Sequence, residues 1–135
     1  MEVFLQTELA VLVLGAVLLL VHVMLAGQFK TLQYGTAWNA GPRDGEMPPL
    51  NPVAGRLQRA QNNYLETFPV AIVALMGVVL AGKTGTITTI AAWGWLAGRV
   101  AYLPLYWLGV PYIRSLAWAI ATLALVVILG VLLFT

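Results

Sequence analysis

Four polar residues on one predicted helix have the composition of a site for a charged ligand. They are Arg56, Arg59, Asn63 and Glu66, at offsets of 0, 3, 7 and 10 residues. At 100° per residue their side chains fall within an arc of about 80°, and the stripe they form is about 15 Å long. Arginine binds carboxylates through paired hydrogen bonds, and a glutamate can pair with an ammonium group. The spacing therefore predicts either a ligand site or a contact with a partner helix.

Two further polar clusters lie on the predicted helices that follow. Arg99, Tyr102 and Tyr106 are at offsets of 0, 3 and 7 on one helix, so they share a face. Arg114 and Ser115 open the next helix, where unpaired backbone N–H groups and the positive end of the helix dipole favour an anion. Because successive helices run in opposite directions, all three clusters are expected at the same end of the molecule.

The expected site carries much more positive than negative charge. Its charged residues are Lys30, Arg56, Arg59, Arg99, Arg114 and Glu66. Five cations and one anion do not neutralise one another, but they suit a ligand with several negative groups and one positive group. Glutathione has this pattern, because it carries two carboxylates, one ammonium group and a thiol that can ionise.

Ionisation of a bound thiol is the step at which such a site would become catalytic. A free thiol has a pKa of about 8.5, and lowering that pKa by two units requires about 2.7 kcal/mol of differential stabilisation. Arg114 and the helix N-terminus beside it could supply this stabilisation in a medium of low dielectric. The predicted chemistry is attack of the thiolate on a lipophilic electrophile that arrives from the bilayer.

The composition places this site in a membrane protein. The 135 residues are 61% hydrophobic and only 9% charged, with a mean hydropathy of +0.88, whereas soluble proteins are about 25% charged. The chain has no cysteine and one histidine, which excludes a disulfide framework and a multi-histidine metal site, so no metal is expected. A net charge of +2 without a basic run argues against nucleic acid as a partner.

The hydropathy pattern predicts an all-α integral membrane protein, a bundle of four transmembrane helices in one domain over residues 1–135. Each predicted span has about 20 residues or more, the length that a helix needs to cross a bilayer. The spans are residues 9–29, 53–81, 87–108 and 111–134. A polar loop rich in glycine and proline is expected between the first two spans, and Pro69 predicts a kink in the second.

The distribution of lysine and arginine predicts the orientation of the bundle. The basic residues at the end that carries the site are Lys30, Arg43, Arg56, Arg59 and Arg114. The connection at the opposite end carries Lys83 alone. Basic residues gather on the cytoplasmic side of membrane proteins, so the site is expected to face the cytoplasm. The sparse loops favour the inner membrane of a bacterium.

Taken together, these motifs resemble the MAPEG family, the membrane-associated proteins in eicosanoid and glutathione metabolism. Residues 56–66 are similar to the family's R-x-x-R-A-x-x-N-x-x-E signature, and residues 27–30, Gly-Gln-Phe-Lys, are similar to its G-Q-x-R. Residues 98–101 with Tyr106 resemble the family's third-helix segment, and residues 113–115 resemble the start of its fourth helix. The resemblance covers essentially the whole chain.

The resemblance implies a homotrimer in membrane lipid, with glutathione bound between neighbouring subunits near the cytosolic face. It also implies that Arg114 holds the thiolate and that Ser115 assists with a hydrogen bond. The residues implied to bind the rest of glutathione, or to line or brace its site, are Lys30, Arg56, Arg59, Asn63, Glu66, Arg99, Tyr102 and Tyr106. Tyr102 stands where some eicosanoid-producing members carry histidine, which favours a detoxifying glutathione transferase or peroxidase acting on small lipophilic substrates.

Several of these residues also have simpler interpretations. The stripe on the second span could be a structural network between subunits, and Arg114 could be an anchor at the membrane interface. Arg99 could be the buried partner of Glu66. His22, deep in the first span, is expected to pack rather than to bind haem, and the Gly-x-x-x-Gly spacing of residues 94–98 predicts a close helix contact.

Two other functions compete with a glutathione-dependent enzyme. One is a non-catalytic member of the same fold, serving as a structural or lipid-binding membrane subunit, because residues suited to a thiolate do not prove turnover. The other is a small proton-coupled exporter of cations, which would depend on an unpaired acid within the membrane. Glu66 is the acid deepest in a span, and arginines outnumber it, so a cationic cargo would be repelled and the exporter ranks third.

Overall fold

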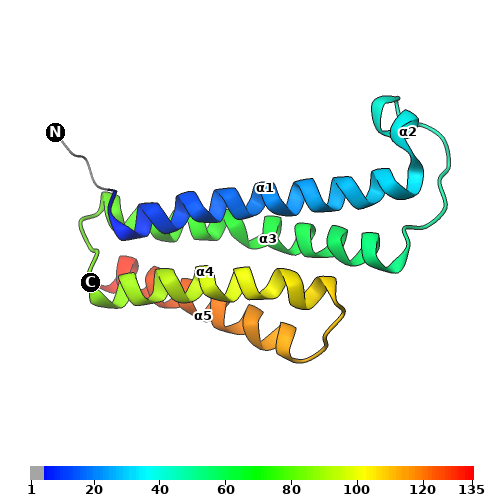
Figure 1. Cartoon of the computed structure of the whole chain (residues 1–135). Coiled ribbons are helices and arrows are strands. Elements are labelled where there is room, and N and C mark those ends of the chain that lie inside the picture. Colours follow the sequence, from blue (N-terminus) through cyan, green and yellow to red (C-terminus); the bar gives the residue numbers. More distant parts are fainter. Residues whose placement is uncertain (1–4) are drawn as a thin grey trace.

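The computed structural model describes residues 5–135, which form five α-helices (Figure 1). The helices are α1 (Thr7–Tyr34), α2 (Thr36–Ala40), α3 (Pro52–Leu80), α4 (Thr86–Trp107) and α5 (Ile113–Phe134). Within these residues the predicted count of four helices is exceeded by one, because the short α2 forms inside the expected loop. Gly35, with φ of 98°, lets the chain leave α1 and begin α2 directly. The predicted single domain also included residues 1–4, which lie outside the described part.

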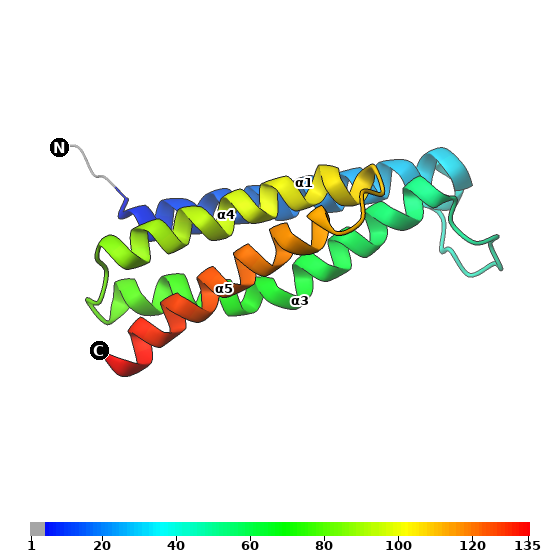
Figure 2. The same cartoon turned by 90° about the horizontal axis from the view of Figure 1, so that it is seen from below.

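The four long helices lie lengthwise against one another in an elongated bundle (Figures 1 and 2). Helices α3 and α4 each contact all the other long helices. One end of the bundle carries the start of α1, the end of α5 and the turn between α3 and α4 (Figure 1). The other end, here called the loop end, carries α2, residues 41–51 and the turn between α4 and α5.

Three of the described helices, α1, α3 and α5, are long and apolar enough to cross a membrane. Helix α4 has 22 residues, which is long enough to span, but its arginine, tyrosines and tryptophans make it less apolar. The charge on α4 is turned inward, because Arg99 is only 1% exposed. Many apolar side chains on α1 and α5 are exposed instead, as expected for surfaces that contact lipid.

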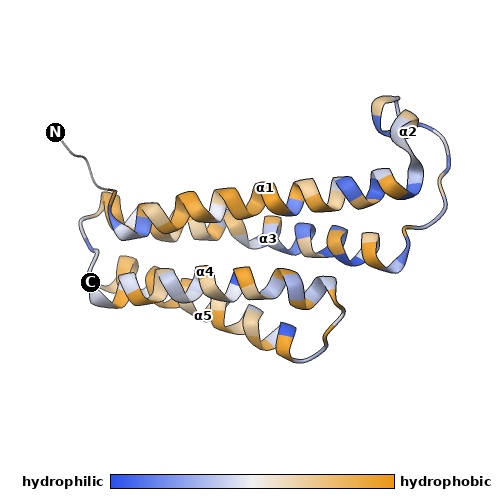
Figure 3. Cartoon of the chain, viewed as in Figure 1, coloured by the Kyte–Doolittle hydropathy of each residue, from blue (hydrophilic) through white to orange (hydrophobic). Residues whose placement is uncertain are grey.

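Hydrophilic residues are concentrated towards the loop end (Figure 3). The first half of α3 and the first turn of α5 are the clearest examples, and both meet the end of α4 there. Helix α3 begins at Pro52, and the Asn51 side chain caps it by accepting a 2.9 Å hydrogen bond from the Ala54 N–H. The helix continues through Pro69, the residue at which a kink is predicted.

Close packing of α4 on α5 depends on Gly98. A Cβ atom added at Gly98 would lie 2.8 Å from the Ala117 carbonyl oxygen and 3.0 Å from the Ala121 Cβ. At Gly94 the added Cβ would be 3.9 Å from the Ala124 Cβ, which is an ordinary contact. The close contact predicted from the spacing of two glycines therefore rests on one of them. The contact at Gly98 also determines how near the start of α5 lies to α4.

Candidate functional site

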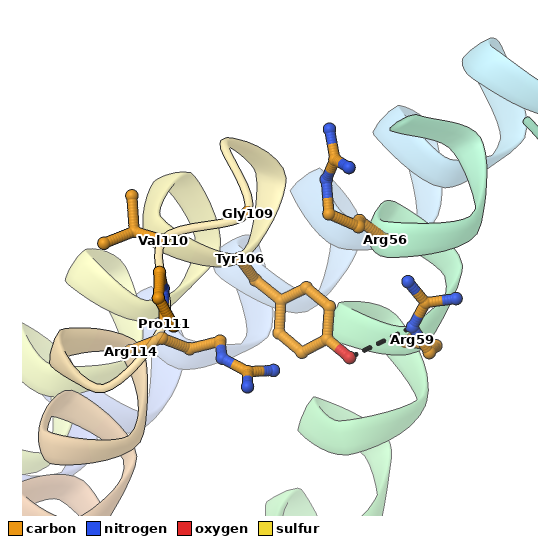
Figure 4. Close-up of a pocket in the computed structure, with 7 residues that line it drawn as sticks. All are labelled: Arg56, Arg59, Tyr106, Gly109, Val110, Pro111 and Arg114. Atoms are coloured by element: carbon orange, nitrogen blue, oxygen red, sulfur yellow. Dashed lines mark hydrogen bonds between the residues drawn. The ribbon is translucent and has the colours of Figure 1, made fainter. Parts of the chain in front are cut away.

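Three adjoining pockets open at the loop end between α3, α4 and α5, and Arg114 lines all of them. The arginine pocket, of about 190 Å³, is lined by Arg56, Arg59, Tyr106, Gly109, Val110, Pro111 and Arg114 (Figure 4). The central pocket, of about 380 Å³, is lined by Arg59, Asn62, Asn63, Glu66, Tyr102, Tyr106 and Arg114. The tryptophan pocket, of about 170 Å³, is lined by Asn63, Tyr102, Arg114, Ser115 and Trp118.

Tyr106 of α4 lies between an arginine of α3 and an arginine of α5 (Figure 4). Its hydroxyl oxygen accepts a hydrogen bond of 3.1 Å from the Arg59 Nε. Its ring centroid is 4.5 Å from the Arg114 guanidinium carbon and 5.9 Å from that of Arg59. A cation over an aromatic face is attracted by the ring quadrupole. Tyr106 therefore holds two guanidinium groups from different helices at one place.

Arg56 connects α3 to the turn that leads into α5. Its Nε donates a 2.9 Å hydrogen bond to the carbonyl oxygen of Trp107, the last residue of α4. A positive charge is favourable there, because the helix dipole is negative at that end. Gly109 in the turn has φ of 72°, a conformation that favours glycine. A Cβ at Gly109 would lie 3.5 Å from the Arg56 side chain, so the arginine packs directly on this turn.

Among the described residues that line the arginine pocket, three are cationic and none is acidic. Arg56 and Arg59 of α3 and Arg114 of α5 all contribute to this lining (Figure 4). The adjoining central pocket includes Glu66. Positive charge in one part of the site and a carboxylate in the next would attract a ligand with anionic groups at one end and a cation at the other.

Arg99 is buried beside the site rather than in its lining. Its Nη1 donates a 2.8 Å hydrogen bond to the Asn63 Oδ1, and its other two guanidinium nitrogens have no hydrogen-bond partner among the described residues. The guanidinium carbon lies 5.0 Å from the Tyr64 ring centroid and 4.5 Å from that of Tyr102. Asn63 is thus the hydrogen-bond partner of Arg99. The alternative considered from the sequence, a pair of Arg99 with Glu66, does not form.

Lys30 is the predicted site residue that lies farthest from this arrangement in the sequence. It is half-buried near the end of α1 and is not among the lining residues of the three pockets. Its neighbour Phe29 packs edge-on against Trp107, with ring centroids 5.6 Å apart. The lysine is therefore at the loop end, but α1 does not carry it to the pockets formed by α3, α4 and α5.

Five lining residues were not predicted as site residues from the sequence. They are Asn62, Gly109, Val110, Pro111 and Trp118. A signal existed for Asn62, because six residues after Arg56 its side chain falls about 40° from Glu66 on the helical wheel. Trp118 is one turn after Arg114, but a tryptophan near the end of a span is also typical of the membrane interface. Gly109 and Pro111 are residues typical of a turn between two spans, but a turn alone does not indicate a pocket.

Comparison with known proteins identifies a family for this chain. The model of the MAPEG family matches residues 8–134, whereas no curated protein matches the chain significantly. Members of this family use glutathione, and they include glutathione transferases and related enzymes as well as non-catalytic proteins. The match covers nearly the whole chain and agrees with the membrane-spanning character of α1, α3 and α5. This integral membrane protein therefore belongs to the MAPEG family.

Proposed function

We propose that the protein is a membrane-bound glutathione transferase or peroxidase that ionises the glutathione thiol for attack on lipophilic electrophiles or hydroperoxides. The observation that carries the proposal is that Arg56, Arg59 and Arg114 line one pocket with Tyr106, which contacts two of them, next to a pocket that contains Glu66. Family membership supports a glutathione-related activity at a coarser level.

The charge pattern of the pockets suits the shape of the ligand. Arginines bind carboxylates bidentately, so the arginine pocket is suited to the carboxylates of glutathione. Glu66 could accept hydrogen bonds from its ammonium group. Asn63 and Tyr102, which line both the central and the tryptophan pockets, offer neutral hydrogen-bonding groups for the peptide backbone. The central pocket, at about 380 Å³, is in the usual range for small-molecule sites.

The start of α5 provides the chemistry proposed for the thiol. Among the described residues, no side chain caps α5 by a hydrogen bond. The Ile113 N–H donates to the Pro111 carbonyl oxygen over 2.6 Å, so the next two N–H groups, of Arg114 and Ser115, are the ones that remain available to an anion. The Arg114 guanidinium adds a full positive charge, and the Ser115 hydroxyl could donate a hydrogen bond to sulfur. The thiol would lose its proton to solvent, and the thiolate would then displace a leaving group from the electrophile. With a hydroperoxide, it would instead attack the outer oxygen and break the O–O bond, so that an alcohol leaves after protonation of its oxygen. The sulfenic acid formed on glutathione would react with the thiol of a second glutathione to give the disulfide and water.

The site is proposed to be completed by neighbouring copies in a homotrimer. Arg59, Glu66 and Ser115 are exposed on the side of the isolated chain, and charged groups inside a bilayer are costly unless they are paired or hydrated. A second copy that covered this side would shield them from lipid. It could also contribute Lys30 from the end of its α1. The loop end is proposed to face the cytoplasm, in a bacterial inner membrane.

The experiment that tests this function is a titration of the detergent-solubilised protein with reduced glutathione, followed by ultraviolet absorbance of the thiolate. We expect saturable binding with a thiolate signal, and we expect Arg114→Ala to remove the signal while the protein elutes from a sizing column as the wild type does. Trp93→Phe, a change on the exposed face of α4 away from the pockets, is the matched control. An undiminished thiolate signal in folded Arg114→Ala would show that Arg114 does not hold the sulfur.

A second candidate is a non-catalytic, lipid-binding subunit of the same fold. It is favoured by an apolar groove of about 360 Å³ between α1 and α3. Its lining residues are Leu5, Leu9, Leu12, Val13, Ala16, Phe68, Ile72 and Met76. A groove with this lining suits an acyl chain and has no group for acid–base chemistry. The same titration separates the two functions, because the lipid-binding subunit would show no saturable binding of glutathione.

A further inference from the structure

Arg99 is a buried cation that has no acidic partner among residues 5–135, and its burial therefore needs an explanation. Only 1% of its surface is exposed, and removing a charge from water is unfavourable unless other interactions compensate. The compensation available is of two kinds. The guanidinium lies against the rings of Tyr64 and Tyr102, at 5.0 and 4.5 Å from their centroids. Its Nη1 donates one hydrogen bond, of 2.8 Å, to the Asn63 Oδ1.

This hydrogen bond determines which way the Asn63 amide points. An amide has an oxygen that accepts and an NH₂ group that donates, whereas a guanidinium only donates. The group of Asn63 that faces Arg99 must therefore be the amide oxygen. Asn63 is half-buried and lines both the central and the tryptophan pockets. Its NH₂ group is consequently the part left for a ligand.

The position of Arg99 is itself set from the other side of the core. The Tyr64 ring, on which the guanidinium lies, is completely buried. Its hydroxyl donates a hydrogen bond to the Gly15 carbonyl oxygen of α1, and its ring stacks on His22 at 4.7 Å between centroids. A series of contacts thus runs from α1 through Tyr64 and Arg99 to Asn63. Each member of the series is held by the one before it.

We propose that Arg99 is a positioning residue that fixes the Asn63 amide with its NH₂ group towards the pocket, where it donates to a carboxylate or carbonyl oxygen of an anionic peptide ligand. The inference rests on the proposed binding of glutathione and names a role within that site. Arg99 does not touch the ligand. It acts through Asn63, and through the Tyr102 ring that forms the neighbouring wall.

The role predicts a specific relation between two substitutions. Arg99→Met removes the donor and the charge but keeps a long apolar side chain in the core, and Asn63→Ala removes the amide. Each is expected to weaken the binding of reduced glutathione by about 10-fold to 100-fold, the range for a hydrogen bond to or from a charged group. Because both changes interrupt the same contact, the double variant should bind no more weakly than Asn63→Ala alone.

Two further variants separate positioning from a purely structural role. Arg99→Lys keeps a buried donor for the Asn63 oxygen and should bind glutathione more tightly than Arg99→Met. Asn63→Asp can pair with Arg99, so the chain should fold, but it presents an acceptor where the ligand needs a donor and should bind weakly. Gln58→Glu is the matched control, because it adds the same negative charge on α3. The Gln58 amide donates to Asn62, and Gln58 itself lines none of the three pockets.

The experiment is calorimetric titration of each detergent-solubilised variant with reduced glutathione, with thermal unfolding of the same samples. Non-additive losses in Arg99→Met and Asn63→Ala, with partial recovery in Arg99→Lys, support the proposal. Additive losses would mean that Arg99 acts on the ligand independently of Asn63, and wild-type affinity in folded Arg99→Met would mean that it does not act on the ligand at all. Either result overturns the proposed role of Arg99 but leaves the proposed function of the protein standing. Absence of binding to the wild-type protein would overturn the proposed function and this inference together.

Discussion

Replacing Gly98 with alanine is expected to push α4 and α5 apart near the site. The added Cβ would lie 2.8 Å from the Ala117 carbonyl oxygen, 3.0 Å from the Ala121 Cβ and 3.2 Å from the Ala121 backbone nitrogen. Two of these three atoms belong to the backbone, so no side-chain rotation can relieve the contact. Helix α5 must move as a body by several tenths of an ångström, and Arg114 and Ser115 in its first turn move with it.

The size of the effect follows from two opposing contributions. Overpacking a tight contact costs about 1–3 kcal/mol, whereas replacing a glycine within a helix by alanine favours the helix by about 1 kcal/mol. The net destabilisation expected for Gly98→Ala is about 1 kcal/mol. Gly94→Ala is the matched control, because its added Cβ would be 3.9 Å from the nearest atom and the helical gain remains uncompensated. The two variants should differ in stability by about 2 kcal/mol, or about 30-fold in the unfolding equilibrium.

The assay is thermal unfolding in detergent micelles, followed by circular dichroism, with both variants measured beside the wild type. Gly94→Ala should unfold at or above the wild-type temperature, and Gly98→Ala below it. Glutathione affinity measured below the transition should fall in Gly98→Ala and stay near the wild-type value in Gly94→Ala. If Gly98→Ala proved as stable as Gly94→Ala, the close approach of α4 to α5 at this glycine would be wrong, and so would its link to the site.

Three further predictions test other parts of the molecule. Tyr106→Phe removes the acceptor for Arg59 but keeps the ring beneath Arg114. Its glutathione affinity should fall about 2-fold to 10-fold, while the thiolate absorbance of the saturated complex persists. Tyr106→Ala should lose both the glutathione affinity and the thiolate absorbance. Raising the salt concentration should weaken glutathione binding, because exposed charges are screened, and calorimetry that found no dependence on salt would contradict an arginine-led site. Thr88→Val removes a hydroxyl that donates to the buried Glu8 carboxylate over 2.9 Å, so thermal unfolding should show a loss of about 1–3 kcal/mol, whereas glutathione affinity should be unchanged.

The stripe on α3 could be predicted from the sequence because helical periodicity is a local property. Once residues 56–66 are helical, the angular spacing of the polar side chains is given by arithmetic, and all four of them line the pockets. Arg99 shows where this reasoning ends. Periodicity places it on one face with Tyr102, but it cannot tell whether that face meets an open pocket or the Tyr64 ring. The packing of α4 against α3 places Arg99 on the Tyr64 ring, where it is buried.

The residues that sequence reasoning missed depend on contacts between distant segments. Val110 belongs to a turn whose place beside Arg56 is set by the crossing of α3 and α4, and this crossing has no local signal. Trp118 is 36% exposed, a value compatible with an interfacial residue, and its role as a pocket wall becomes visible only with Asn63 of α3 opposite it. Helix α2 is a single short element, and isolated helices of that length are marginal, so propensity could not predict it.

The position of the pockets bears on how two substrates of opposite polarity could meet, if the proposed function holds. A charged peptide cannot enter the middle of a bilayer, but at the loop end, where hydrophilic residues are concentrated, the arginines of α3 and α5 would lie near water. A lipophilic electrophile would approach from the other direction, along the apolar faces of the bundle. The tryptophan pocket joins the two regions, because Trp118 is a half-exposed aromatic wall one turn below Arg114 and shares its pocket with Ser115. A thiolate held at the start of α5 would therefore lie between the charged ligand site and the surface that contacts lipid, which is where a reaction between these two substrates has to occur.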